Sequence, residues 1–273
     1  MITVVVPTLN VEKTLTACLN SLRAQETNPD SIIVVDGGST DYTPVIAQEL
    51  ADRVITTQAN RSLQRNIGWQ HAHGSAVLFV DADMILDPLV ITACQEVFDR
   101  DLSTVALVIP ETSYGSTFWA RVKSFERSFY QGIWWMEATR CIRRDVLEAT
   151  GGYDQALIGG EDWDLDERIR SYGSIGRIHP RIWHNEQDLT LRQTQSKKAH
   201  YASTLQTYAN KHPHRARRQL SLVWRVGLFL RRPWQLTSHP ILSMGLGIMG
   251  GVEWLSHIRS SDSETSHLEK PIS

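Results

Sequence analysis

Ala76-Val77-Leu78-Phe79-Val80-Asp81-Ala82-Asp83 is the stretch that decides the fold, because an apolar run ends in two carboxylates one residue apart. The run is short, continuous, β-branched and aromatic, and Gly74-Ser75 precedes it, so it predicts a buried strand. Such a strand places two negative charges at the carboxyl edge of a sheet, where open α/β sheets bind ligands. Close carboxylates repel each other unless a cation lies between them, and Mg²⁺ or Mn²⁺ prefers oxygen ligands. The pair suggests a metal–diphosphate site, although an Asp after a strand is often only a turn former or a helix N-cap.

Strand-like and helix-like segments alternate on both sides of this stretch. Predicted strands are residues 2–6, 31–35, 53–57, 76–80, 105–110 and 178–183, and predicted helices are residues 11–24, 43–50, 63–73 and 161–172. Strands separated by helical crossovers of this length predict an α/β fold with a doubly wound, mostly parallel sheet.

The composition is that of a folded protein, with 41% hydrophobic residues, 21% charged residues and a net charge of -2. A chain of 273 residues can bury one core, or a core plus a smaller appendage. Its cysteines, Cys18, Cys94 and Cys141, are few and odd in number, which fits neither a disulfide framework nor a cysteine-based zinc site. They favour a reducing, cytosolic setting. No basic segment precedes a long apolar stretch at the start, so we expect no cleaved signal peptide.

Further groups of glycine and polar residues follow the predicted elements in a fixed order. They are Asp36-Gly37-Gly38-Ser39-Thr40-Asp41, Arg61, Arg65-Asn66-Ile67-Gly68, Ala72-His73-Gly74, Gly151-Gly152-Tyr153-Asp154 and Gly159-Gly160-Glu161-Asp162. With Asp81-Ala82-Asp83 among them, the sequence resembles the family 2 glycosyltransferases, which have the GT-A fold. The resemblance covers residues 1–185, and its specificity lies in the order of the motifs, since any one alone would be weak.

The resemblance implies a nucleotide pocket at the ends of the first two strands. Pro7, Asn10 and Glu12 would line this pocket after the first strand. Asp36 would bind the base of the nucleotide, and Asp41 would hold the loop beside it.

The resemblance also implies roles nearer the diphosphate. Arg61 and Arg65 would lie near the base or the diphosphate, where Arg recognises phosphate oxygens well; otherwise they form a solvated helix face. Asp81 would contact the ribose, and Asp83 would hold a Mg²⁺ or Mn²⁺ ion that bridges the phosphates of the donor. His184 falls where some relatives place a further metal or diphosphate ligand, but a half-buried structural histidine explains it equally well.

Asp162 would be the general base that takes the proton of the acceptor hydroxyl, with Glu161 beside it shaping the site. Glycosyl transfer needs such a base, and it needs a cation that stabilises the leaving nucleoside diphosphate. Asp162 lies at a predicted helix N-terminus, where the helix dipole favours the ionised form. The alternative is that Glu161 and Asp162 only cap this helix.

The last third of the sequence is basic. Residues 189–252 contain no acidic residue and ten cationic ones: Arg192, Lys197, Lys198, Lys211, Arg215, Arg217, Arg218, Arg225, Arg231 and Arg232. Nucleic acid would explain this charge but not the apolar stretches 220–230 and 241–254. Arg, Trp and aliphatic residues together suit a membrane interface with anionic lipids. Residues 233–252 lack charges but are too polar to predict a transmembrane helix.

These observations predict three regions and no nucleic-acid partner. Residues 1–190 form a GT-A catalytic domain, with a nucleotide-sugar-binding half (1–110) and an acceptor-binding, catalytic half (111–190). Residues 191–258 form a basic, amphipathic, helical membrane-associating region, peripheral or re-entrant on the cytoplasmic face of the cell membrane. Residues 259–273 form a disordered tail.

The predicted activity is transfer of one sugar from a nucleotide-diphosphate sugar to a hydroxyl of a lipid-linked acceptor or cell-envelope glycan, with inversion. Processive polysaccharide synthases of this superfamily carry a Gln-x-x-Arg-Trp motif, which the sequence does not contain. The alternative is a catalytically silent nucleotide-sugar-binding scaffold at the membrane. A nucleotidyltransferase would show a Gly-rich phosphate loop after the first strand, where this chain has Pro7-Thr8-Leu9-Asn10.

Overall fold

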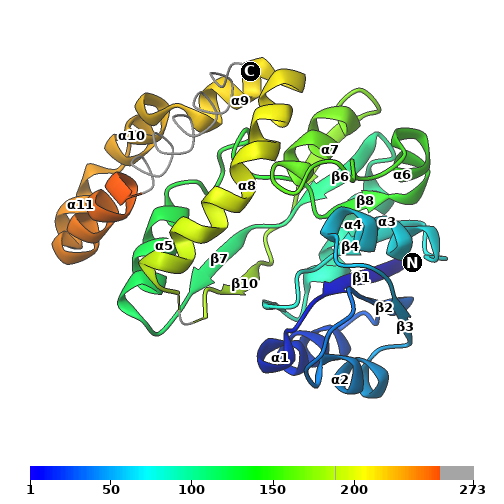
Figure 1. The fold of residues 1–273 in the computed structure, drawn as a ribbon. Helices are drawn as coiled ribbons and strands as arrows, with labels where there is room; N and C mark the ends of the chain where they lie inside the picture. Colours follow the sequence, from blue (N-terminus) through cyan, green and yellow to red (C-terminus); the bar gives the residue numbers. More distant parts are fainter. Residues whose placement is uncertain (188, 253–273) are drawn as a thin grey trace, which may run out of the picture. The chain divides into compact units, whose positions relative to one another are not determined.

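A computed structural model describes residues 1–187 and 189–252, which fall into two compact units (Figure 1). The first unit comprises residues 1–112 and 131–185, and the second comprises residues 113–130 and those from 186 onward.

The first unit contains a seven-stranded sheet in the order β3-β2-β1-β4-β8-β6-β9. Its strands are β1 (Ile2–Thr8), β2 (Ser31–Asp36), β3 (Arg53–Thr56), β4 (Ala76–Phe79), β6 (Thr104–Val108), β8 (Cys141–Arg143) and β9 (Ser174–Arg177). Its helices are α1 (Glu12–Arg23), α2 (Thr43–Leu50), α3 (Arg61–Gln70), α4 (Val90–Arg100), α6 (Arg144–Thr150) and α7 (Glu161–Ile169). Strand β8 pairs antiparallel with β4 and β6, and the other neighbours pair in parallel. The expected α/β fold with a mostly parallel sheet is confirmed.

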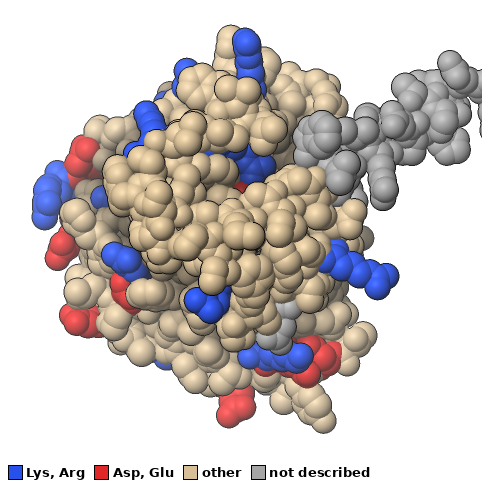
Figure 2. Space-filling model, turned by 90° about the vertical axis from the view of Figure 1, so that its left-hand side faces the viewer, with Lys and Arg blue, Asp and Glu red and all other residues tan. Residues whose placement is uncertain are grey.

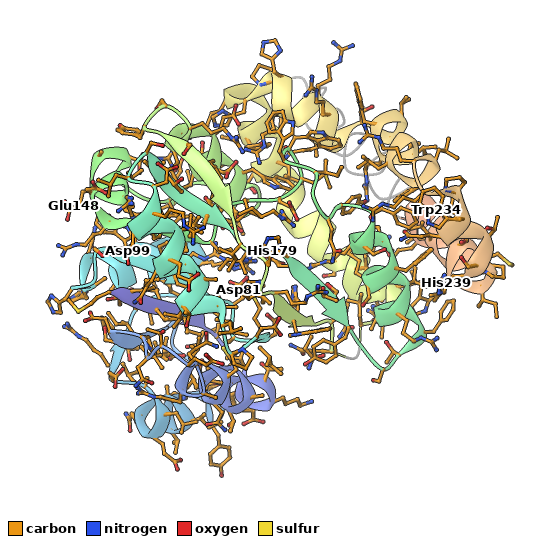
Figure 3. The ribbon with its side chains drawn as sticks, turned by 180° about the vertical axis from the view of Figure 1, so that it is seen from behind. Asp81, Asp99, Glu148, His179, Trp234 and His239 are labelled. Carbon is orange, nitrogen blue, oxygen red and sulfur yellow. The ribbon has the colours of Figure 1, made fainter. Side chains whose placement is uncertain are left out.

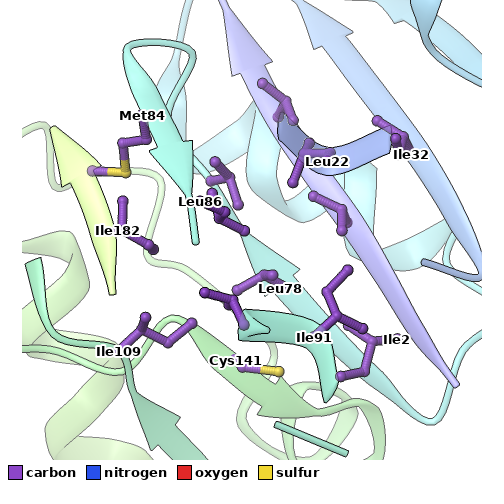
Figure 4. Close-up of a cluster of buried hydrophobic side chains, with 14 of the residues drawn as sticks. Ile2, Leu22, Ile32, Leu78, Met84, Leu86, Ile91, Ile109, Cys141 and Ile182 are labelled. Atoms are coloured by element: carbon purple, nitrogen blue, oxygen red, sulfur yellow. The ribbon is translucent and has the colours of Figure 1, made fainter. Parts of the chain in front are cut away.

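The central strands are continuous apolar runs because both faces of the sheet are covered by helices. Along β1, Val4 and Val6 join one buried cluster whereas Val5 joins the other, as the two-residue period of a strand requires. Residues of α1, α2 and α4 complete the first cluster, part of which is drawn in Figure 4, and residues of α3, α6 and α7 complete the second.

The strand order reverses beside β1, because the chain runs from β1 to β2 and β3 on one side and then returns to β4 on the other. The carboxyl ends of β1 and β4 therefore flank a topological switch point, where open α/β sheets bind ligands. The loops after these strands begin at Leu9 and Val80, so the predicted site residues lie at the expected edge of the sheet.

A second sheet contains three strands in the order β5-β10-β7, namely β5 (Met84–Leu86), β10 (Ile182–Asn185) and β7 (Glu111–Tyr114). Strands β5 and β10 are antiparallel, and His184 pairs with Met84. The predicted strand at 178–183 is wrong in position, because pairing starts only at Ile182, beyond Pro180, which has no N–H to donate.

Helix α3 begins two residues earlier than the 63–73 that the sequence predicts and ends at Gln70. Its N-cap residue, Asn60, accepts a hydrogen bond from the backbone N–H of Leu63 at 2.9 Å, which satisfies one free donor of the first turn. The earlier start places Arg61 on the first turn of the helix, and Arg65 one turn further along.

The second unit is helical and has a core of its own. Its helices are α5 (Phe118–Ser128), α8 (Leu191–Lys211), α9 (Pro213–Leu220), α10 (Leu222–Leu230), α11 (Pro233–Ser238) and residues 240–252. The core joins Phe125 and Phe129 to Leu246 and Met249, and Phe229 packs against it. Helix α5 thus packs with the C-terminal helices, although it lies within the segment 111–190.

Three further expectations concern the whole chain. All three cysteines are free, buried thiols. Within the described residues, no helix combines the length and the apolarity that crossing a bilayer requires. The predicted disordered tail, residues 259–273, lies outside the described residues.

Candidate active site

The carboxylate of Asp36, at the end of β2, is used inside its own turn. Asp36 is 2% exposed, and its Oδ1 accepts a hydrogen bond from Oγ1 of Thr8 at 2.9 Å. Its Oδ2 accepts from the backbone N–H groups of Gly38 and Ser39 at 3.1 and 2.8 Å. Gly38 has a φ of +86°, a conformation that glycine adopts without a steric penalty. Asp36 therefore shapes the turn, and its contact with a nucleotide base stays a prediction.

Asn10, Glu12 and Asp41 tie the loop after β1 to the turn after β2. Oδ1 of Asn10 accepts a hydrogen bond from the backbone N–H of Thr40 at 2.9 Å. Oε2 of Glu12 accepts from the backbone N–H of Tyr42 at 3.0 Å, while the backbone N–H of Glu12 donates to Oδ2 of Asp41 at 3.2 Å. The structure thus brings these three side chains together at the carboxyl ends of β1 and β2.

Gln64 joins the same two strands from the side of α3. Its Nε2 donates to the backbone carbonyls of Thr8 and Val35, both at 2.8 Å, and its side chain is buried. Pro7 lies buried in β1, one residue before the first of these carbonyls. Gln64 is a positioning residue that sequence reasoning missed, because an isolated glutamine on a helix carries no local signal.

Arg65 of α3 joins the acids that follow β4 to the acids that begin α7. It is fully buried, and its Nη2 donates to Oδ1 of Asp81 at 2.8 Å. Its Nη1 donates to Oδ1 of Asp162 at 2.7 Å and lies 3.4 Å from Oε1 of Glu161. The guanidinium also lies over the ring of Tyr153, 5.0 Å from its centroid, in a cation–π contact. One guanidinium thus holds both carboxylates for which the sequence predicts different roles.

Asp81 is an ionised, doubly paired carboxylate. Its Oδ2 accepts from Nη1 of Arg140 at 3.3 Å, so cations contact both of its oxygens. Burial alone would raise the pKa of Asp81, but attraction by Arg65, Arg140 and Arg61 outweighs burial and holds the pKa far below its usual range. In Figure 3, Asp81 lies among side chains from several elements of the first unit, whereas Glu148 lies at the edge of that unit.

Glu161 has the opposite environment. Its side chain is 5% exposed, and burial raises its pKa to about 7, with the negative charge of Asp162 adding to the effect. Attraction by Arg65 and Arg61 offsets only part of this rise. Arg61 lies 3.5 Å from Oε1 of Glu161, and its side chain is 47% exposed, so it reaches the site from the solvent side.

Glu161 and Asp162 occupy the first turn of α7 because Gly160 before them has a φ of +83°, which is open to glycine. The side chain of Asp162 is 33% exposed, in contrast to the buried side chain of Glu161. Of the two acids, Asp162 is therefore the one that a bound molecule can reach.

Helix α3 holds the segment before α7 by three side chains. Asn66 donates to the backbone carbonyl of Tyr153 and accepts from its N–H, both at 2.8 Å. Oγ of Ser62 donates to the carbonyl of Leu157 at 3.1 Å, and Asn60 donates to the carbonyl of Gln155 at 3.2 Å. These hydrogen bonds hold the segment that follows Gly151 and Gly152, and they thereby place Asp162 against Arg65.

Asp83 and His184 lie together at one end of the antiparallel β5–β10 pair, where the carbonyl of Asp83 accepts from the backbone N–H of Asn185 at 2.9 Å. Oδ2 of Asp83 lies 3.4 Å from Nε2 of His184, and Nδ1 of His184 lies 3.9 Å from Oε2 of Glu111. The described residues contain no group of three or more His, Cys, Asp or Glu side chains arranged to hold a metal ion. One carboxylate and one imidazole fit an ion such as Mg²⁺ or Mn²⁺, which keeps water ligands and takes others from substrate phosphates.

Arg140 and Glu111 are members of the site that the sequence did not reveal. Arg140 forms ion pairs with both Asp81 and Glu111, and Glu111 faces His184. Arg140 directly precedes β8 and Glu111 begins β7, two short strands whose pairing partners are distant in sequence. No local motif could have placed them beside Asp81.

The fold is an α/β fold of the GT-A type, and comparison with known proteins agrees. The model of the family described as "Glycosyl transferase family 2" matches residues 3–154, more than half of the sequence. The chain therefore belongs to glycosyl transferase family 2.

Individual relatives share part of the chain. A "PGL/p-HBAD biosynthesis glycosyltransferase" of Mycobacterium bovis is 30% identical over 186 residues, which cover 63% of this chain and 70% of that protein. The "O-antigen chain rhamnosyltransferase RfbN" of Salmonella typhimurium is 24% identical over 193 residues, 63% of this chain and 62% of that one. Another curated relative is matched over only 13% of its length.

A solved structure extends the likeness in fold to nearly the whole chain. The mannosyltransferase PcManGT of Pyrobaculum calidifontis, in complex with GDP-Man and Mn²⁺, is 19% identical with a TM-score of 0.58. The alignment covers 99% of this chain and 81% of the other.

Proposed function

We propose that this chain transfers a single sugar from a nucleotide-diphosphate sugar to a hydroxyl of its acceptor, with inversion of the anomeric configuration. The observation that carries this proposal is the pair of hydrogen bonds that Arg65 makes, 2.8 Å to Asp81 and 2.7 Å to Asp162. Because one guanidinium spans both acids, the proposed donor-binding carboxylate and the proposed base are a few ångströms apart. A displacement needs donor and base at this proximity.

In this proposal the nucleotide-sugar donor binds at the topological switch point beside β1. The nucleotide is surrounded by residues that lie together at the ends of β1 and β2. They are Pro7, Asn10, Glu12, Asp36 and Asp41. Asp81 contacts the ribose in this proposal. Arg65 and Arg140 hold its carboxylate in place, so its position is fixed before the donor binds.

Asp83 and His184 would hold a divalent ion, Mg²⁺ or Mn²⁺. When bound, this ion would supply positive charge to the diphosphate as it leaves. Support comes from the oxygen and nitrogen donors of these side chains and from the Mn²⁺ present in the complex of PcManGT. Arg61 and Arg65 add fixed positive charge beside the same group.

Asp162 is the base in this proposal, and Glu161 keeps the site in shape. The hydrogen bond from Arg65 goes to Oδ1 of Asp162, so Oδ2 is the oxygen that we assign to the acceptor hydroxyl. Glu161 is buried, and its raised pKa makes it a proton carrier near neutral pH. A protonated Glu161 next to Asp162 lowers the repulsion between the two side chains.

The acceptor is, in this proposal, a lipid-linked or cell-envelope glycan at the cytoplasmic face of the membrane. Two relatives named for "PGL/p-HBAD biosynthesis" and for an "O-antigen chain" support the class of acceptor. The basic sequence of residues 189–252 and the free, buried thiols support the location.

Thermal unfolding with a panel of nucleotide sugars, with and without Mn²⁺, tests the donor and metal assignments. A true donor at about one hundred times its dissociation constant stabilises the folded chain by about 2.7 kcal/mol. Asp83→Ala should abolish the Mn²⁺-dependent part of the shift, whereas Asp99→Ala, an exposed acid on α4, should retain it. A full Mn²⁺-dependent shift in Asp83→Ala would contradict the metal assignment.

Product analysis tests the transfer itself. We expect metal-dependent donor consumption and a product of inverted configuration. Donor binding without turnover would instead indicate a nucleotide-sugar-binding scaffold, and retained configuration would exclude Asp162 as the base of a single displacement.

A further inference from the structure

Arg140, which directly precedes β8, is an arginine largely withdrawn from water. Its side chain is 12% exposed. Lysine and arginine side chains ordinarily extend into solvent, as several do at the edges of the face in Figure 2. A guanidinium that leaves water loses hydration, and only charged partners compensate for this loss. The partners of Arg140 therefore indicate which role its charge has.

Two carboxylates hold the guanidinium of Arg140, but they use only part of it. Its Nε donates to Oε1 of Glu111, and its Nη1 donates to Oδ2 of Asp81 at 3.3 Å. Its Nη2 donates to no atom in the part of the chain that the structure describes. Nη2 is also not one of the buried polar atoms that lack a hydrogen bond, so it reaches solvent. Arg140 thus retains N–H donors for a molecule that enters the site.

The contacts of Arg140 place it between the two halves of the proposed donor site. It contacts Asp81, the proposed ribose ligand, and Glu111. Oε2 of Glu111 lies 3.9 Å from Nδ1 of His184, and Nε2 of His184 lies 3.4 Å from Oδ2 of Asp83. Because Asp83 follows Asp81 by two residues, these contacts close a ring. Arg140 is the fixed cation of this ring, between the proposed ribose contact and the proposed metal ligands.

The diphosphate is the part of a nucleotide sugar that lies between its ribose and a bound divalent ion. Asp81 would hold the ribose, and Asp83 with His184 would hold the ion, so phosphate oxygens would lie beside Arg140. Guanidinium N–H groups bind phosphate oxygens well, because charge and hydrogen bonds act together. An arginine that two carboxylates already orient loses little conformational entropy on binding, which strengthens such a contact.

We propose that Arg140 binds the diphosphate of the nucleotide-sugar donor through Nη2. Arg65 contacts Oδ1 of Asp81 and Arg140 contacts Oδ2, so the two arginines flank the proposed ribose ligand. The charge of Arg140 then also stabilises the nucleoside diphosphate as it leaves. This inference rests on the proposed function, because it needs a nucleoside diphosphate at the end of β4.

Equilibrium binding without metal tests the role of Arg140. UDP, GDP, CDP, ADP and dTDP are titrated into the full chain by calorimetry in the presence of EDTA, so that only protein groups contact the phosphates. The matching nucleosides are measured by ligand-detected NMR. Arg140→Gln should weaken binding of the preferred diphosphate by about tenfold to a hundredfold, the usual contribution of a charge-assisted hydrogen bond. Nucleoside affinity should change by less than about threefold, because Arg65 still holds Asp81.

Arg23→Gln is the matched control, because it also removes an arginine from an ion pair of the first unit. Arg23 pairs with Asp52, which directly precedes β3 and therefore lies at the amino edge of the sheet, away from the site. This variant should keep its diphosphate affinity within about twofold of the wild type. An equal loss in both variants would show that net charge alone attracts the ligand, and would contradict a specific contact.

A second pair of variants separates phosphate binding from neutralisation of Glu111. If Arg140 only neutralised Glu111, then Arg140→Gln/Glu111→Gln would bind the diphosphate as the wild type does, because the unpaired carboxylate is also gone. We expect this double variant to bind as weakly as Arg140→Gln, and Glu111→Gln alone to bind at least as tightly as the wild type. Recovery in the double variant, or an equal loss of nucleoside and diphosphate affinity in Arg140→Gln, would overturn the proposal.

The wild type keeps this proposal separate from the transferase proposal. If it binds a diphosphate that Arg140→Gln binds equally well, only the role of Arg140 is overturned. If it binds none of the five diphosphates, with EDTA or with Mn²⁺, the donor assignment and the role of Arg140 are overturned together.

Discussion

Arg65 contacts three acids that differ in character, although the acids alone attract attention in the sequence. It contacts Asp81, Glu161 and Asp162, yet the pKa of Asp81 is held far down while that of Glu161 is raised. The difference arises because Asp81 has a second arginine, Arg140, whereas Glu161 is buried beside the negative Asp162.

Asp162→Asn should lower kcat/KM for transfer by about a hundredfold to ten-thousandfold, the usual contribution of a general base. Donor binding, measured by the thermal shift, should remain, because the amide still accepts a hydrogen bond from Arg65. Glu167→Gln, on the same helix and away from Arg65, should change kcat/KM by less than about threefold. Comparable losses in both variants would refute the assignment of Asp162 as the base.

Glu161 should make the folded chain less stable as pH rises through neutrality. Burial raises its pKa to about 7 from the ordinary 4.5, so the folded chain keeps a proton that the unfolded chain releases between those values. The free energy of unfolding therefore falls as pH rises from about 4.5 to just above about 7, by on the order of 3 kcal/mol in total.

Urea unfolding at about pH 4 and about pH 8 measures this effect, since these two pH values bracket the window. Glu161→Gln should remove most of the fall, and Glu148→Gln, an exposed acid on α6, should keep it. Parallel curves for the wild type and Glu161→Gln would disprove the pH linkage.

At the scale of elements, the site depends on the hydrogen bonds by which α3 holds the segment that leads to α7. Gly151 and Gly152 have φ values of +74° and +72°, but only Gly152 lies against side chains of α3. A Cβ on Gly152 would clash with Oδ1 of Asn66 and Nε1 of Trp69, whereas a Cβ on Gly151 would meet nothing within 4 Å.

These two glycines form a matched pair of substitutions. Gly151→Ala should cost about 1 kcal/mol of stability, which is the backbone strain alone. Gly152→Ala should cost about 3 kcal/mol or more, because the clash adds to the strain. Chemical denaturation gives both values, and equal losses would show that the contact of Gly152 with α3 does not matter.

On the scale of the whole molecule, the two units carry different features. The first unit carries the ion-pair cluster and the proposed metal ligands, and the second has a helical core of its own. The family match ends at residue 154, so most of the second unit lies outside it.

Local patterns in the sequence are sufficient for the frame of the first unit. The apolar runs at β1, β2 and β4 predict buried strands, and the acids after them predict the edge that binds ligands, because strand period and burial are local properties. The motifs also place Asp36, Asp81, Asp83 and Asp162 at element ends.

The tertiary structure alone decided which of these residues meet. Arg65 lies 97 positions from Asp162, and Arg140 lies 59 from Asp81. Long-range pairing through short strands such as β8 and β10 leaves no periodic signal, so Arg140 and Glu111 could not be predicted. The packing of α10 on α5 likewise includes the ion pair of Arg225 with the buried Glu126, a contact between residues 99 positions apart. The sequence by itself thus determined the sheet and the kinds of side chain at its edge, and packing determined their partners, because ion pairs depend on distance in space rather than along the chain.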